Sequence, residues 1–358
     1  MPDTGIRMGL HRRGPTARLS AARTTGFVPL VSQRRSMGIH STTIAEGASF
    51  QLCAYWARVA KSVPHACVLN LGWGGRGIMA LSPGGEIYED ALRAIDRVCT
   101  LLESRGFAPY VEYVDFDQGE GDTRFEGWGE AVVALRDHFN AEVRKRTGQS
   151  SEIPWLLCQP SSFFAGCDAM VRSQYALCKA RPDEFIQTGP NYHCTYQADL
   201  VHRSEGSHAR KGEFNGLCVA RALYQKRNPA VLQWSSIEYD EKLSVIRLTP
   251  SIPVWRDHKI KDPGSWGFNV YDGAGDEVVI SKVKICHKGR SVELYMSRAL
   301  SEGPLRRVDY ALNSRYINKR ENYNDRPRGQ IRTKNPFGTT YHKHIPLYGY
   351  MPHSREYF

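Results

Sequence analysis

The sequence predicts two domains: an α/β domain built on a parallel sheet covered by helices on both faces, followed by an all-β sandwich. The chain has 358 residues, which is long enough for two domains. Over residues 46–227 apolar runs typical of strands alternate with segments of helical period, and this alternation is typical of a parallel sheet. Over residues 228–358 short strand-like runs follow one another without a long helix, which indicates a sandwich.

The elements of the first domain follow from apolar spacing and from their boundary residues. Residues 86–105 place Ile87, Leu92 and Ile95 on one helical face, and Gly106 suits the end of that helix. Ser204 is a good first residue for the last helix. The other predicted helices cover 49–63, 126–146 and 166–179, and the predicted strands cover 66–71, 109–116, 153–159 and 184–188.

The second domain and the N-terminal segment look different. Runs such as SVIRL, WGFNVYD and SVELYMS are separated by Gly, Pro and Asp-Gly turns, and the last 45 residues are expected to be mostly loop. Residues 1–45 show no clear period and are predicted to be a basic, irregular segment.

The net charge of +11 is concentrated at the two ends of the chain. Residues 1–37 carry +6 and residues 303–358 carry +7, so the middle is close to neutral. Basic ends indicate contact with polyanions, acidic glycans or a partner protein, or they are simply solvated. No apolar run is long enough to span a membrane and no secretory signal is evident, so neither membrane nor secretion is expected.

Nine cysteines are scattered along the chain without a CxxC motif. Most lie in apolar segments, which predicts buried free thiols in a protein made in a reducing cytoplasm. Neither a metal site nor a cofactor is expected.

Three loops combine residues suited to acyl chemistry, and the first two follow predicted strands. LGWGGRGI (71–78) offers Gly74 and Gly75, whose backbone N–H groups can approach a substrate oxygen closely. FDQGEGDT (116–123) offers the Gln118 amide as a second oxyanion donor and Glu120 as loop support. In parallel sheets functional loops gather at the carboxyl ends of strands, so these loops are expected to meet.

The third loop carries an acid and a histidine three residues apart, Asp199 and His202, just before the last helix. A carboxylate that accepts a hydrogen bond from an imidazole fixes its tautomer and stabilises its protonated form. The alternative is a helix-entry aspartate beside a surface histidine.

The order of these loops resembles the SGNH (GDSL-like) hydrolase superfamily, and most closely its sialate-O-acetylesterase-like carbohydrate esterase branch. The resemblance covers residues 46–225 and rests on Gly74-Gly75, on the QGE-x-D run 118–122 and on D-x-x-H at 199–202. It implies a flavodoxin-like three-layer α/β/α domain and a jelly-roll-like sandwich, as in phage tail-associated members. It also implies that His202 is the general base, that Asp199 orients it, and that Gly74 or Gly75 with Gln118 forms the oxyanion hole.

The nucleophile is unknown, because the family's G-x-S block after a central strand has no counterpart before residue 66. Gly148-Gln149-Ser150 spells GQS, but it precedes a predicted strand and so belongs to the wrong end of the sheet. Three explanations stay open: an upstream segment lies outside this chain, another polypeptide supplies the strand, or residues 1–45 form a replacement strand in a non-catalytic descendant.

Three functions therefore remain. The first is a serine esterase, located in a virion tail, that removes O-acetyl groups from a bacterial surface glycan; contacts with other tail proteins and with further copies of the chain are expected. The second is a catalytically inactive structural or receptor-binding tail protein that keeps the fold. The third and weakest is nucleic-acid binding through the basic ends, for which no aromatic-basic groove is evident.

Overall fold

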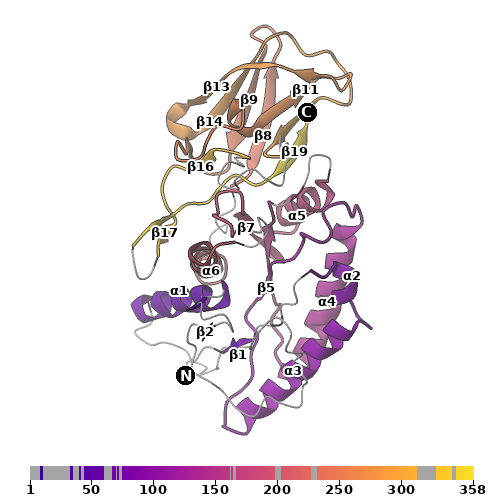
Figure 1. Ribbon diagram of the computed structural model, residues 1–358, viewed down its shortest axis with the longest axis vertical. Coiled ribbons are helices and arrows are strands. Elements are labelled where there is room, and N and C mark those ends of the chain that lie inside the picture. The colour runs from indigo at the N-terminus through magenta and orange to yellow at the C-terminus, as the bar shows by residue number, and fades with distance from the viewer. Residues whose placement is uncertain are drawn as a thin grey trace.

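The computed structural model of the chain contains an α/β part and a β part, one above the other in Figure 1. It describes residues 9–10, 33–34, 40–41, 44–59, 67–69, 71, 75–161, 163, 167–197, 203–226, 232–312, 328–340 and 344–358. The parallel strands lie in the α/β part, and the β part is built almost wholly from antiparallel strands. The predicted mixture of a parallel α/β sheet followed by β structure is therefore present.

Three parallel strands form the centre of the α/β part, in the order β5 (Val114–Phe116), β6 (Trp155–Gln159) and β7 (Phe185–Pro190). Val114 lies opposite Trp155, which in turn lies opposite Phe185. β6 is buried along its whole length, as expected for a strand with neighbours on both sides and helices above and below.

Helices cover both faces of this sheet, as Figure 1 shows on either side of β5. Trp155, Leu157 and Phe185 point to one face, where they share a core with α3, α4 and α5. Leu156 and Ile186 alternate with them and point to the other face, where they pack on α1 and α6. The bounds are α1 (Ile44–Val59), α3 (Glu86–Glu103), α4 (Trp128–Thr147), α5 (Ala169–Ala180) and α6 (Glu205–Val219), which continues as a π-helical turn (Ala220–Tyr224).

A second parallel pair joins β1 (Gly9–Leu10) to β4 (Val68–Leu69). No strand followed by G-x-S is expected from the sequence before residue 66, and β1 is followed by His11 and Arg12. The pairing agrees with the explanation in which residues 1–45 supply a replacement strand. A further two-residue pair, β2 (Gln33–Arg34) with β3 (His40–Ser41), lies in the same N-terminal segment, which is therefore less irregular than predicted.

Two four-stranded antiparallel sheets make up most of the β part, and both contribute to one hydrophobic core. One has the order β12 (Glu277–Val278), β11 (Phe268–Tyr271), β15 (Arg307–Tyr310) and β19 (Ser354–Tyr357). The other has the order β13 (Ile280–Cys286), β14 (Ser291–Met296), β9 (Val245–Pro250) and β8 (Trp234–Asp240). Two smaller antiparallel pairs join β10 (Val254–Arg256) to β16 (Ile331–Thr333) and β17 (Gly338–Thr339) to β18 (Pro346–Leu347).

The strand predicted over 109–116 is shorter than expected, and Gln149 explains why. Its side-chain amide accepts a hydrogen bond from the Val111 N–H at 2.8 Å and donates one to the Val111 carbonyl at 2.9 Å. The amide thus takes the place of a neighbouring strand. It also places Gly148-Gln149-Ser150 beside the start of β5, away from the carboxyl edge. The first helix begins at Ile44, five residues before the predicted start, and α4 ends at a left-handed Gly148 as expected.

The two parts meet along a buried polar seam between β6 and the C-terminal strand segment. Gln159 accepts a hydrogen bond from the His353 N–H at 2.8 Å and donates one to the His353 carbonyl at 2.9 Å. The fully buried Arg328 donates to the Ser161 carbonyl at 3.0 Å and also to the carbonyl of Phe163. Buried backbone carbonyls need such donors, so the seam holds the segment after β6 in place.

Candidate active site at the carboxyl edge of the sheet

The first two loops are joined by one carboxylate. Asp122 accepts a hydrogen bond from the backbone N–H of Ile78 at 2.7 Å, at the start of the short helix α2 (Ile78–Leu81). A Cβ on Gly77 would lie 2.7 Å from the Asp122 Oδ1 atom, so glycine permits this close approach. Gly75 adopts a left-handed backbone with φ of 73°, whereas Gly74 lies outside the described residues. The structure therefore places the end of the 71–78 loop against the 116–123 loop.

Gln118 is the centre of this junction. Its Oε1 accepts from the Trp128 indole N–H at 2.9 Å, and its Nε2 donates to the Arg76 carbonyl at 3.2 Å and to Asp122. Both amide hydrogens have acceptors, so donation to an oxyanion requires one of these bonds to open. The oxyanion role of Gln118 stays a prediction, and the contacts show an amide that ties two loops together.

Gly119 and Glu120 follow directly. Gly119 has a φ of 150°, and a Cβ there would lie 2.3 Å from the terminal methyl of Met170, so only glycine suits this turn. Glu120 is exposed in the same turn, and its loop-supporting role stays a prediction.

The third loop reaches the second through an ion pair. The guanidinium of Arg203, which directly follows His202 in sequence, pairs with Asp117, which directly precedes Gln118. The Arg203 side chain is only 7% exposed. Burial acts to raise the pKa of Asp117, but the Arg203 guanidinium outweighs it and holds that pKa below its ordinary value.

The described residues on either side of the 198–202 stretch are joined to each other. Tyr196 and Arg203 form an antiparallel bridge, and the Gln197 amide donates to the Arg203 carbonyl at 3.1 Å. Asp199 and His202 themselves lie outside the described residues, so their predicted contact stays a prediction.

A second set of buried polar side chains lies near the ion pair, on the face of the sheet covered by α6. Lys211 donates to the Thr188 hydroxyl at 2.7 Å, and the Asn215 amide donates to Asp115 at 2.7 Å. Burial, with a smaller contribution from the Asp117 carboxylate, raises the pKa of Asp115 to about 6, against the lowering effect of Asn215 and Lys211. Asp115 is thus the carboxyl in this group that changes protonation near neutral pH.

Two further groups near this edge resemble catalytic groups but are buried. Burial raises the pKa of Cys158 to about 12, so its thiol stays protonated at neutral pH. Ser161 Oγ lies 3.2 Å from Nε2 of His353, whose Nδ1 lies 2.7 Å from the Ala311 carbonyl oxygen. Ser161 is 6% exposed and His353 is fully buried. We interpret this pair as part of the seam between the two parts, and the nucleophile remains unassigned.

Sequence reasoning located Asp122 within the QGE-x-D run but gave it no role in joining the loops, and it missed Asp117 and Arg203. A signal was present in YVDFDQ, where Asp115 and Asp117 interrupt an otherwise apolar strand. Charged residues in such a position need partners, and a search for a cation close to the predicted His202 finds Arg203 next to it.

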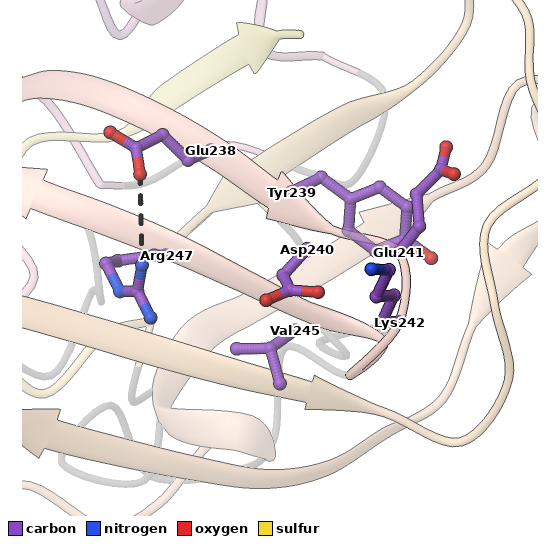
Figure 2. A pocket seen from close by; sticks show the side chains of 7 residues that line it. All are labelled: Glu238, Tyr239, Asp240, Glu241, Lys242, Val245 and Arg247. Carbon is purple, nitrogen blue, oxygen red and sulfur yellow. Dashed lines mark ion pairs between the residues drawn. The ribbon is translucent and has the colours of Figure 1, made fainter.

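Metal sites, membrane spans and pockets are further features to consider among the described residues. Among the described residues, no group of three or more His, Cys, Asp or Glu side chains could hold a metal ion. Within the same residues no helix is both long and apolar enough to cross a bilayer. Figure 2 shows a shallow hollow on the β8–β9 hairpin of the β part, lined by Glu238, Tyr239, Asp240, Glu241, Lys242, Val245 and Arg247.

Comparison with known proteins identifies the fold. No protein-family model and no curated protein matches the chain. The structure is similar to a carbohydrate acetylesterase from Xanthomonas citri, with a TM-score of 0.52 and 13% identity. The match covers 86% of this chain but 64% of that one, so this chain spans less than two thirds of the neighbour's length. The chain has an esterase-like fold.

A second solved structure is more distant and supports no functional conclusion. A protein from Arabidopsis thaliana matches with a TM-score of 0.38 and 14% identity, over 53% of this chain and 71% of that one.

Proposed function

We propose that the chain is an SGNH-type esterase that removes O-acyl groups, chiefly acetyl, from a bacterial surface polysaccharide. The observation that supports the proposal is that Asp122 joins the 71–78 and 116–123 loops, and that Arg203, the residue after His202 in sequence, pairs with Asp117. The fold shared with a carbohydrate acetylesterase supports it. A flavodoxin-like three-layer domain with a jelly-roll-like sandwich, a place in a phage tail and contacts with other tail proteins or further copies belong to the same proposal, as does synthesis in the host cytoplasm.

The reaction follows from the assigned roles. A serine hydroxyl attacks the ester carbonyl carbon while His202 takes its proton and Asp199 stabilises the imidazolium. Backbone N–H groups at Gly74 or Gly75, together with Gln118, receive the negative charge on the carbonyl oxygen. The bond to the sugar oxygen breaks as His202 returns the proton to it, and water then releases acetate from the enzyme.

The test is ester hydrolysis by the whole chain, measured with p-nitrophenyl acetate and with an O-acetylated bacterial polysaccharide. His202→Ala is expected to abolish turnover of both, and Asp199→Asn to lower kcat by orders of magnitude. His258→Ala is the matched control, because His258 is exposed in the β part. Equal background rates for all four proteins would remove the esterase proposal.

A catalytically inactive tail protein is the alternative, and two observations favour it. Both amide hydrogens of Gln118 are already engaged, and β1 beside β4 is followed in sequence by His11 and Arg12, not by a G-x-S block. In that case the chain binds O-acetylated polysaccharide with no acetate release, which a binding measurement combined with an acetate assay detects.

A further inference from the structure

The two-stranded sheet of β10 and β16, with Tyr350 bridged to it, presents aromatic and cationic side chains on one face. Trp255 of β10 lies opposite Arg332 of β16, and Arg332 also forms an antiparallel bridge with Tyr350. Residues directly opposite one another in a sheet project to the same face, at about 5 Å spacing. Tyr348 contacts Arg332 and Lys334 contacts Trp255, so both lie beside this face. We name these residues together with His193 the aromatic row: Trp255, Arg332, Lys334, Tyr348, Tyr350 and His193.

Cations lie against the rings of this row. The Arg332 guanidinium carbon is 3.7 Å from the centre of the Tyr348 ring, and the Lys334 ammonium is 5.9 Å from the centre of the Trp255 ring. Trp255 is 45% exposed and Lys334 is exposed, so both are accessible. The row therefore offers an exposed indole ring with a cationic side chain against it.

A buried acid fixes the middle of the row. Asp257, 7% exposed, accepts a hydrogen bond from the Tyr350 hydroxyl at 2.6 Å and lies 3.5 Å from Nε of Arg332. Both side chains are held in one orientation by this carboxylate. A pre-oriented surface loses less conformational entropy when a ligand binds.

The row continues onto the loop of the candidate active site. The exposed ring of His193 stacks on Tyr350, with ring centres 4.1 Å apart and planes 7° from parallel. His193 follows β7 and begins the stretch that leads through Tyr196 to Arg203, between which Asp199 and His202 lie in sequence. The row therefore includes one residue of the stretch 191–197, which precedes Asp199 and His202 in sequence.

We propose that the aromatic row binds a polysaccharide that carries carboxylate groups and leads it to the candidate active site. Apolar C–H faces of sugar rings pack on exposed aromatic rings, and the Lys334 ammonium and Arg332 guanidinium complement carboxylates. Asp257, which lies beside Arg332, lowers the net positive charge of the row and so disfavours the dense charge of a nucleic-acid backbone. This inference rests on the proposed function, because the bound polysaccharide is taken to be the substrate of the esterase. The binding test itself requires no hydrolysis.

The experiment is calorimetric titration of the whole chain with a galacturonate hexamer, and with the same hexamer in methyl-esterified form. Esterification removes the carboxylate charge and leaves the sugar rings. Trp255→Ala is expected to weaken hexamer binding by about tenfold or more, and Lys334→Gln by a few-fold. Lys242→Gln, an exposed cation in the hollow of Figure 2, is the matched control and should bind as the parent does.

Each outcome bears on one proposal. Four results would overturn the aromatic row as a site for an acidic glycan. These are failure of the hexamer to bind, equal binding of the esterified form, unchanged binding by Trp255→Ala, and tighter binding of single-stranded DNA than of the hexamer. Hexamer binding without hydrolysis of p-nitrophenyl acetate supports the row and counts against the esterase. If both activities are present, Trp255→Ala should raise KM for the acetylated polymer by a larger factor than KM for p-nitrophenyl acetate, whereas Lys242→Gln should change neither value.

Discussion

The two faces of the β5–β6–β7 sheet hold different kinds of core. On the face of α3, α4 and α5, large rings such as Trp128, Trp155 and Phe185 are packed together. On the face of α6, a smaller apolar cluster gives way toward the carboxyl edge to Asp115, Asp117, Arg203 and Lys211. Burial of apolar area on the first face stabilises the fold. On the second face, charged side chains beside the candidate site are removed from water, which costs free energy. The buried charged side chains therefore lie on the α6 side of the sheet.

The largest expected effect comes from breaking the apolar face. Trp155 is 2% exposed and donates its indole N–H to Asn140 at 3.0 Å. Trp155→Ala is expected to lower the free energy of unfolding by about 3–5 kcal/mol, because it leaves a cavity and an unpaired amide oxygen. Urea unfolding followed by circular dichroism measures this loss. Trp155→Phe, which keeps most of the ring volume, should cost less; an equal cost would show that the ring volume is not what stabilises this face.

The ion pair of Asp117 with Arg203 tests the polar face. Removing either partner alone leaves a buried charge without its counterion, so Arg203→Met and Asp117→Asn should each destabilise by about 3 kcal/mol. The double variant is expected to lose less than the sum of the two, and a double-mutant cycle from urea unfolding gives the coupling. Additive losses would mean that the two side chains act independently.

Asp115 is expected to make the free energy of unfolding depend on pH. Its pKa of about 6 in the folded protein lies above the ordinary 3.8, so the unfolded chain binds fewer protons between those values. Stability contributed by this carboxyl is therefore present below about pH 4 and is lost as the pH rises through 6. Asp115→Asn should remove this slope and raise the free energy of unfolding at pH 7.5 by up to about 3 kcal/mol. Parallel slopes for parent and variant from pH 4 to 8 would contradict the assignment.

The smallest effect is expected far from both faces. Glu238 and Arg247 form an exposed pair at 3.8 Å on the β8–β9 hairpin, drawn as a dashed line in Figure 2. Glu238→Gln should change the free energy of unfolding by less than about 0.5 kcal/mol, because exposed ion pairs contribute little. The same urea titration serves as the baseline for the three larger effects.

Local sequence patterns predicted the fold better than they predicted the side-chain contacts that join the loops of the candidate site. Alternation of apolar runs located β6 and the long helices, since burial on both faces leaves a strong pattern in sequence. The strand ends were less predictable. The Gln149 side chain, not a neighbouring strand, makes the hydrogen bonds to the Val111 backbone, and apolar periodicity cannot reveal such a contact. The pairing of β1 with β4 depends on a contact between residues almost sixty positions apart, which local propensity cannot indicate.

The candidate site divides in the same way. The glycine-rich turn and the QGE turn were located from sequence and lie together, with Ile78 bonded to Asp122. The part that sequence reasoning missed is the set of charged contacts across the sheet edge, since the choice of Arg203 as the partner of Asp117 depends on three-dimensional packing.

The exchange of hydrogen bonds between Gln159 and the backbone of His353 has a consequence for how the molecule melts. If the α/β part separates from the β part, the Gln159 side-chain amide and the backbone N–H and carbonyl of His353 lose their hydrogen-bond partners. These groups are buried, so the loss is costly. Heating should therefore give one cooperative endotherm for the whole chain, and expressing the two halves as separate polypeptides should yield two insoluble fragments.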